Sequence, residues 1–224
     1  MKKFTVLAMM LMISVFVYAQ KSETRSLGSF NAISVGESVK VTLVKGSSEK
    51  AEIEVVGANL DDVETKISGG RLTVGMANGS YRNVKVKATI TYTSLEALSV
   101  SSSAKVTASD KISSNRFKLS VSSSGYADIN LDSDDVVVKV SSSGDAIING
   151  SGKNLDVSIS SSGSLEGFGF KVEEADVSVN SSGKARVYVT DNLDARANSS
   201  GKVVYKGDPR TSISANSSGK VVRG

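Results

Sequence analysis

The chain carries at residues 117–131 the sequence FKLSVSSSGYADINL, in which a Ser-Ser-Ser-Gly tetrapeptide interrupts a regular two-residue alternation. The apolar side chains hold every second position on both sides of it: Leu119, Val121, Ala127, Ile129 and Leu131. Apolar residues at every second position are typical of strands with one buried face. No stretch of the chain shows the three-and-four spacing of an amphipathic helix, so the pattern predicts an all-β protein.

The tetrapeptide recurs, with small changes, in seven copies: Ser101–Ala104, Ser122–Gly125, Ser141–Gly144, Ser160–Gly163, Asn180–Gly183, Asn198–Gly201 and Asn216–Gly219. Successive copies are 21, 19, 19, 20, 18 and 18 residues apart. A period this narrow indicates stacked coils of one repeating unit. At about 3.3 Å per residue each coil traces roughly 60 Å, enough for two or three short sides. We therefore expect a parallel β-solenoid, right-handed, with about 18–21 residues per coil.

The alternation also suggests how each tetrapeptide is oriented. If it continues through the repeat, the middle serine and the glycine face inward, and stacked serine hydroxyls bond to one another along the coils. If the chain turns there instead, the serines face solvent. We expect the inward arrangement.

The N-terminal 19 residues have the pattern of a signal peptide. Lys2 and Lys3 precede an apolar run of 14 residues, and Val17-Tyr18-Ala19 fits a small-x-small cleavage site. We expect residues 20–26 to be a short segment and residues 27–224 a single domain without a membrane span. The predicted location is the periplasm, the cell surface or the medium.

Within that domain, residues 98–224 hold the regular repeat and residues 27–97 are less regular. Four alternating runs occur there, at 39–43, 51–55, 72–76 and 84–90, with glycine-containing turns between them. They fit either hairpins that cap the solenoid or earlier coils whose repeat has decayed.

Composition excludes several kinds of chemistry. The chain has no histidine, cysteine or tryptophan, which removes Ser-His and Cys-His catalysis, zinc held by nitrogen or sulfur, disulfides and a lipidated cysteine. Without Lys2 and Lys3, 25 basic residues face 23 acidic ones, and the charges are interspersed. This balance gives no support to nucleic-acid binding. We expect no metal and no cofactor.

A polysaccharide-active enzyme, lyase or glycosidase, is the alternative to a binding protein on this scaffold. Such enzymes place carboxylates or a base in a cleft made of long loops. The paired acids Asp134-Asp135 and Glu173-Glu174 occur in short coils that leave little chain for such loops. The sequence therefore predicts no catalytic residue.

Lysine and asparagine occupy repeated positions in the last three coils. Lys184, Lys202 and Lys220 each follow the repeat glycine, 18 residues apart, and stacking should bring their backbones within about 5 Å of one another. A second aligned position holds Asn180, Asn198 and Asn216. Lysine here either protects the terminal coil from edge-to-edge pairing or, with the asparagines, binds an anionic glycan or envelope polymer.

Three further features carry a family resemblance: Phe30-Asn31-Ala32-Ile33-Ser34-Val35, Gly70-Arg71-Leu72-Thr73-Val74, and the serial Ser-Ser-Gly repeats that end at Ser217-Ser218-Gly219-Lys220-Val221-Val222. Together they resemble the auto-transporter adhesin head GIN domain of exported Bacteroidetes-type proteins, over residues 27–224. The resemblance implies a β-helix-like envelope protein with an adhesive or structural role and no catalytic residues. We therefore expect a non-catalytic, adhesin-like binding or structural module of the envelope that is monomeric or weakly self-associating.

Overall fold

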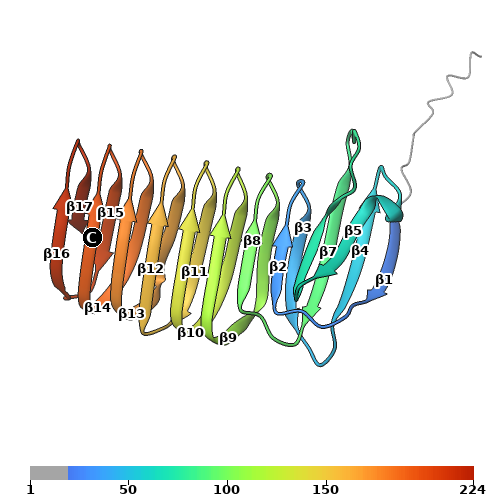
Figure 1. Cartoon of the computed structure of the whole chain (residues 1–224), viewed down its shortest axis with the longest axis horizontal. Helices are drawn as coiled ribbons and strands as arrows, with labels where there is room; N and C mark the ends of the chain where they lie inside the picture. Colours follow the sequence, from blue (N-terminus) through green and yellow to red (C-terminus); the bar gives the residue numbers. More distant parts are fainter. Residues whose placement is uncertain (1–19) are drawn as a thin grey trace, which may run out of the picture.

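The computed structural model describes residues 20–224, which form a stack of flattened coils (Figure 1). The predicted signal peptide, residues 1–19, lies outside the described residues. Strands from successive coils pair in parallel along the stack, which confirms the all-β parallel solenoid. The helical segment among the described residues is the short 3-10 turn η1 (Leu60–Asp62).

Each coil contributes one strand to each of two sheets that face each other. Four long strands bend from the first sheet, sheet I, into the second, sheet II: β9 (Lys105–Val121), β10 (Tyr126–Val140), β13 (Ser164–Val179) and β14 (Lys184–Ala197). Sheet I also contains β1 (Lys21–Ser26), β3 (Lys40–Lys45), β4 (Lys50–Val56), β7 (Lys85–Tyr92), β11 (Asp145–Ser151), β15 (Lys202–Lys206) and β17 (Lys220–Arg223). Sheet II also contains β2 (Ala32–Val35), β5 (Val63–Ser68), β6 (Arg71–Met76), β8 (Ala97–Val100), β12 (Asn154–Ile159) and β16 (Arg210–Ala215).

The core lies between the two sheets and consists mainly of aliphatic side chains, with a few aromatic rings such as Phe117 and Phe170. In β10 the inward positions Ala127, Ile129, Leu131, Val136 and Val138 are all at most 1% exposed. The equivalent alternate positions are buried in the neighbouring coils, because the parallel register aligns residues such as Val138 and Val157. The two-residue alternation therefore predicted the buried face correctly.

The serines, however, face solvent, and the expectation that the middle serine points inward is wrong. Ser123 and Ser124 have φ angles of 50° and 59°, and Gly125 N–H donates to Ser122 O over 2.8 Å. Two positive φ angles and an i to i+3 hydrogen bond define a tight turn like those of β-hairpins. The tip of the turn contains two residues, so inward and outward positions alternate in the same way before and after it. The glycine is therefore still buried. All seven repeats form this turn.

The tips of these seven turns form one exposed row along the solenoid, which we call the serine edge (upper edge in Figure 1). It consists of Ser102, Ser103, Ser123, Ser124, Ser142, Ser143, Ser161, Ser162, Ser181, Ser182, Ser199, Ser200, Ser217 and Ser218. Ser124 N–H donates to Ser142 O at 3.0 Å, and Ser143 N–H donates to Ser161 O at 3.1 Å in the next coil. The stacked turns thus satisfy one another's backbone groups, which offsets the cost of left-handed serine.

The N-terminal region combines both arrangements that the sequence left open. Strands β2 and β3 form one coil with the turn Gly36–Val39, in which Glu37 and Ser38 have positive φ. This coil pairs in register with β8 and β9 of the next repeat. Beyond it, β1, β4 and β7 pair antiparallel in sheet I, and β5 and β6 form a hairpin in sheet II.

Arg25 closes this end of the core. It extends from β1 in sheet I, and its guanidinium donates to the carbonyls of Leu60 and Val63 and to the hydroxyl of Thr65 over 2.6–3.0 Å. The two sheets are therefore tied together at the end of the stack by charge-assisted hydrogen bonds.

Among the described residues, Tyr92 at the end of β7 has a buried hydroxyl group that lacks a hydrogen-bond partner. Its side chain is 1% exposed. Burial, with a smaller contribution from Asp110, raises the pKa of Tyr92 to about 12. Both the orphaned hydroxyl and the shifted pKa have measurable consequences.

We expect Tyr92→Phe to leave stability at neutral pH unchanged or to raise it by about 1 kcal/mol, because the variant removes an unsatisfied buried hydroxyl. Above pH 10 the unfolded tyrosine ionises while the folded one stays neutral, so the parent loses stability as pH rises toward 12. The loss from this residue should reach about 2 kcal/mol near pH 11.5, and the variant should lack it. Urea unfolding of both proteins at pH 8 and 11.5 measures the difference. An equal gap at the two pH values contradicts the assignment.

Candidate ligand-binding surface

The three lysines predicted to stack do so on the outer face of sheet I. Lys184, Lys202 and Lys220 are register partners on β14, β15 and β17. All three are exposed, and within residues 20–224 none of them forms an ion pair. The prediction that these lysines stack at strand spacing is therefore confirmed.

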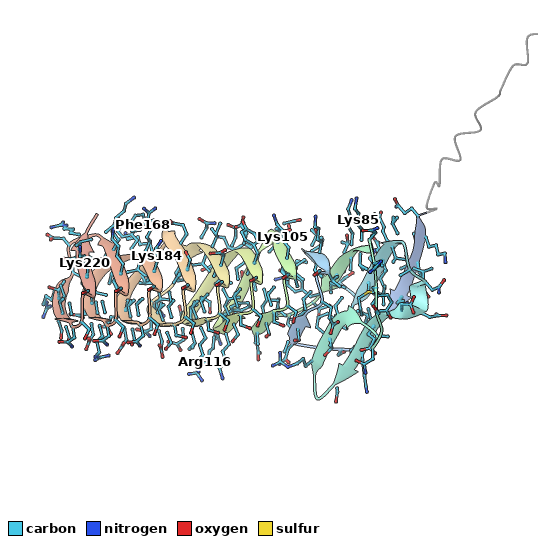
Figure 2. The ribbon with its side chains drawn as sticks, turned by 90° about the horizontal axis from the view of Figure 1, so that it is seen from above. Lys85, Lys105, Arg116, Phe168, Lys184 and Lys220 are labelled. Carbon is cyan, nitrogen blue, oxygen red and sulfur yellow. The ribbon has the colours of Figure 1, made fainter. Side chains whose placement is uncertain are left out.

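The asparagines lie on the other side of the serine edge. Each is the first residue of its turn and continues the series of outward-facing positions of sheet II: Asn180, Asn198 and Asn216. Asn180 borders a shallow groove there with Lys139, Ser158 and Ser178, among others. Asn216 donates to Asn198 Oδ1 at 3.3 Å. The six predicted residues thus flank the serine edge as two separate rows and do not share one flat face. Figure 2 looks down on that edge, with Phe168 on the sheet I side and Arg116 on the sheet II side.

The lysine row continues at the N-terminal end of the same face. Lys87, Lys40 and Lys105 are register partners on the neighbouring strands β7, β3 and β9. Lys40 and Lys105 occupy the position immediately after a turn, as Lys184 does, and Tyr126, Asp145 and Ser164 separate the two groups. We call Lys40, Lys87 and Lys105 the N-terminal triad and Lys184, Lys202 and Lys220 the C-terminal triad.

Sequence reasoning missed the N-terminal triad because strand order in space differs from strand order in the chain. Strand β3 lies between β7 and β9, although β7 follows it by forty residues in the sequence. One local signal was present: Gly36-Glu37-Ser38-Val39 precedes Lys40 as a serine turn precedes Lys105. Glu37 departs from the serine pattern because its carboxylate accepts a hydrogen bond from Met76 N–H.

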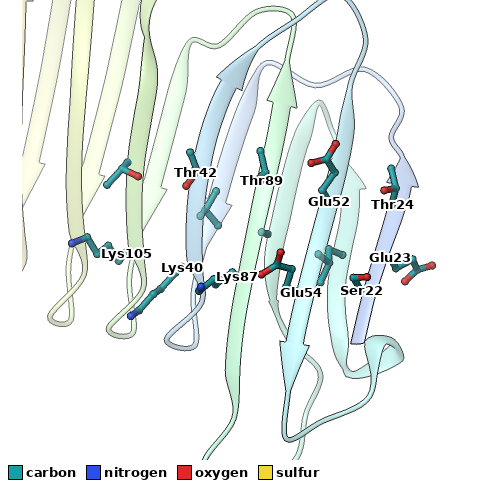
Figure 3. A pocket seen from close by; sticks show the side chains of 14 residues that line it. Ser22, Glu23, Thr24, Lys40, Thr42, Glu52, Glu54, Lys87, Thr89 and Lys105 are labelled. Atoms are coloured by element: carbon teal, nitrogen blue, oxygen red, sulfur yellow. The ribbon is translucent and has the colours of Figure 1, made fainter. Parts of the chain in front are cut away.

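A polar groove of about 730 Å³ crosses the N-terminal triad on sheet I (Figure 3). Fourteen residues from β1, β4, β7, β3 and β9 line it, and they include the three lysines. The triad lies next to Glu54 in one row, and a parallel row holds Glu52 and a series of threonines. This groove offers ammonium donors, hydroxyl groups and carboxylate acceptors to one ligand.

Three of the four acidic residues considered for catalysis, Asp134, Asp135 and Glu174, have charged or polar partners. Asp134 accepts from Lys153 at 2.9 Å, which raises the pKa of that lysine. Asp135 lies 3.7 Å from Arg116, and Glu174 accepts from Asn192 at 2.9 Å. Three more carboxylates, Asp156, Asp176 and Asp194, stack in register on sheet II, and Arg196 bridges two of them. In residues 20–224 no group of three or more carboxylates is arranged to hold a metal ion.

Aromatic rings on the outer face of sheet I are covered by cations. Lys105 Nζ lies 4.5 Å from the centre of the Tyr126 ring, and Lys206 Nζ lies 4.3 Å from that of Phe168. Partial burial and the neighbouring Asp128 and Asp145 raise the pKa of Tyr126. These rings pack against their own lysines and do not form an open stacking platform.

The fold and surface together define a two-sided parallel β-solenoid with a packed aliphatic interior and a charged outer face. Residues 29–209 match the family described as "Putative auto-transporter adhesin, head GIN domain". The chain belongs to this family, as its repeats and N-terminal motifs suggested. No helix within residues 20–224 is long and apolar enough to cross a membrane.

Several solved structures share the fold at low sequence identity. A "putative adhesin" from Bacteroides fragilis has a TM-score of 0.78 at 17% identity, with 92% of this chain and 96% of that chain covered. A "putative adhesin" from Parabacteroides merdae gives 0.71 at 22% identity, and a "Putative lipid binding protein" from Parabacteroides distasonis gives 0.73 at 21%. Coverage is again 92% of this chain and 96% of each of those chains. No curated protein matches the chain.

Proposed function

We propose that this protein is an exported, non-catalytic, adhesin-like module of the cell envelope that binds an anionic glycan or envelope polymer along the lysine row of sheet I. Its family and the names of its structural relatives support an adhesive role. The observation that carries the proposal is the C-terminal triad, because its three exposed lysines, which have no ion pair within residues 20–224, stand at strand spacing, about 4.8 Å. That spacing is close to the length of one sugar unit in an extended chain.

The lysine row favours a polymer over a single small anion. One carboxylate meets one lysine, whereas a chain along the solenoid axis meets several in succession. Each exposed contact is weak and salt-sensitive, so affinity arises from repetition. The asparagines lie on the sheet II side and contact this ligand only if it reaches across the serine edge. Otherwise they contribute only to the structure of the turns.

A direct test uses polygalacturonate, a carboxylated polysaccharide, with neutral dextran as the reference ligand. We expect the purified protein to bind polygalacturonate but not dextran, and to bind more weakly at high salt because counterions screen the lysines. Lys184→Gln, Lys202→Gln and Lys220→Gln combined should weaken binding at least fivefold in biolayer interferometry. The matched control, Arg116→Gln, Lys118→Gln and Lys139→Gln combined, removes the same charge from sheet II and should bind like the parent.

Three other results would replace the proposal. If the C-terminal variant binds normally but forms new oligomers in light scattering, the lysines protect the terminal edge instead. If polygalacturonate or another glycan is cleaved, measured as new reducing ends, the polysaccharide-active enzyme is the better description. Anionic liposomes form a third arm of the test, since one structural relative is named for lipid binding. Binding to liposomes but not to polygalacturonate would transfer the role to a membrane surface.

A further inference from the structure

The groove over the N-terminal triad is built from two rows of outward side chains that cross five adjacent strands. The first row reads Ser22, Glu54, Lys87, Lys40 and Lys105, and the second reads Thr24, Glu52, Thr89, Thr42 and Thr107. Each row follows the hydrogen-bonded register, so neighbouring members stand about 4.8 Å apart. Figure 3 shows the labelled lysines along one row, with Thr42 and Thr89 along the other.

Exposure distinguishes the roles of the two rows. Lys40, Lys87 and Lys105 are exposed, whereas Thr42, Thr89 and Thr107 are half-buried and form the floor beside them. Within residues 20–224 none of the three lysines has an ion pair, although Glu54 is the register partner of Lys87. Charge and hydroxyl groups are thus both available at one place.

The combination selects a class of ligand. Lysines attract carboxylate, phosphate or sulfate, but the three glutamates at one end of the groove, Glu23, Glu52 and Glu54, repel a ligand that carries only negative charge. Carboxylates are strong acceptors for hydroxyl donors, and threonine hydroxyls both donate and accept. A ligand with acidic groups and free hydroxyls satisfies all three kinds of side chain. Acidic sugars have this chemistry, whereas DNA and polyphosphate carry negative charge without free hydroxyl groups along the chain.

We infer that this groove is a specific binding site for a short segment of a carboxylated oligosaccharide, with sugar carboxylates at the N-terminal triad and sugar hydroxyls at the threonines and glutamates. The site lies about four strand spacings, roughly 19 Å, from the C-terminal triad, measured from Lys105 to Lys184. The inference rests on the proposed binding role but uses different residues. The C-terminal triad supplies charge alone, whereas the groove reads both charge and hydroxyl groups.

The test uses tetragalacturonate, an oligosaccharide of four carboxylated sugars, in isothermal titration calorimetry with the full protein. We expect Thr42→Val and Thr89→Val combined to weaken binding at least fivefold, although these substitutions change no charge and little volume. Thr73→Val, on the outer face of sheet II, is the matched control and should bind like the parent. Lys40→Gln, Lys87→Gln and Lys105→Gln combined should weaken binding at least tenfold, while the C-terminal lysine variant should keep it.

Three results would overturn the inference. The first is equal binding by the threonine double variant and the Thr73→Val control, which would mean that the groove binds through charge alone and without specificity. The second is equal loss in the two lysine variants, and the third is competition by tripolyphosphate as strong as that by tetragalacturonate. The groove and the proposed function fail separately. Loss of polygalacturonate binding only in the C-terminal variant refutes the groove, and loss only in the groove variants refutes the C-terminal triad.

Discussion

Replacing Gly163 by valine is expected to lower the free energy of unfolding by about 3–5 kcal/mol, at the upper end of the range for crowded core positions. A Cβ at Gly163 would lie 2.9 Å from Val140 O and 3.0 Å from Val140 C, in the preceding coil. Those atoms belong to a strand fixed by hydrogen bonds on both sides, so they cannot move aside locally. The glycine is required for this close approach and not for its own backbone angles.

The same substitution at Gly183 should cost less. There the nearest atom to a new Cβ is the Ile159 methyl Cγ2 at 2.7 Å, and a side chain can shift more easily than a strand. Ser164→Val is the control for both variants, because it introduces the same side chain at the next position, on the outer face, and should change stability by about 0.5 kcal/mol or less.

Guanidinium unfolding followed by far-ultraviolet circular dichroism measures all three variants. Because each coil contacts only its neighbours, hydrogen exchange should also show the loss concentrated in the coils beside the substitution. Equal midpoints for Gly163→Val and Ser164→Val would show that the glycine row tolerates side chains, contrary to the close approach described above.

The sequence was sufficient for the coil and for its inward face, because both depend on periodicity. Seven similar tetrapeptides at a narrow period required equivalent residues to stack, and the alternation around Gly125 identified the residues that are buried. The register of Lys184, Lys202 and Lys220 followed from the same repeat, since an 18-residue period leaves no room for slippage. Periodic features were therefore predictable from one chain.

The orientation of the serines was not predictable in this way. Serine is not a usual residue for left-handed backbone, and Ser123 and Ser124 both adopt it. Only the stacked hydrogen bonds between successive turns explain why they do, and those bonds exist only once the coils are assembled. A rule based on local preference favours an extended strand here, and tertiary structure overrides it.

The candidate groove could not be predicted for a topological reason. Its lysines at positions 40, 87 and 105 come from strands that are neighbours only because β7 returns beside β3 after the hairpins. No period connects these residues, and each lysine alone has the pattern of an ordinary solvated side chain. The C-terminal triad was visible from the sequence because a repeat encodes it, whereas the N-terminal triad depends on the irregular part of the fold.

Replacing Phe170 by alanine is expected to cost about 3–5 kcal/mol, since it leaves a cavity that the rigid coils cannot close. Phe170 is fully buried, and its register partner in the preceding coil is Gly150. A Cβ at Gly152 would lie 3.0 Å from Phe170 Cζ. The Phe170 ring thus occupies space that the absence of a side chain at Gly152 leaves open. Alternation of large and small side chains along the stack maintains core density where the coils are narrow.

Phe168→Ala provides the control, because Phe168 lies on the same strand two residues away but on the outer face. Its ring is half-buried and packs under Lys206 and Arg186, so its removal should cost less than about 1 kcal/mol. Phe170→Leu should recover most of the loss, because leucine refills much of the space. Thermal and chemical unfolding of the three variants distinguish the two faces of one strand. If Phe168→Ala and Phe170→Ala were equally destabilising, the burial of Phe170 against Gly152 would not be what stabilises these coils.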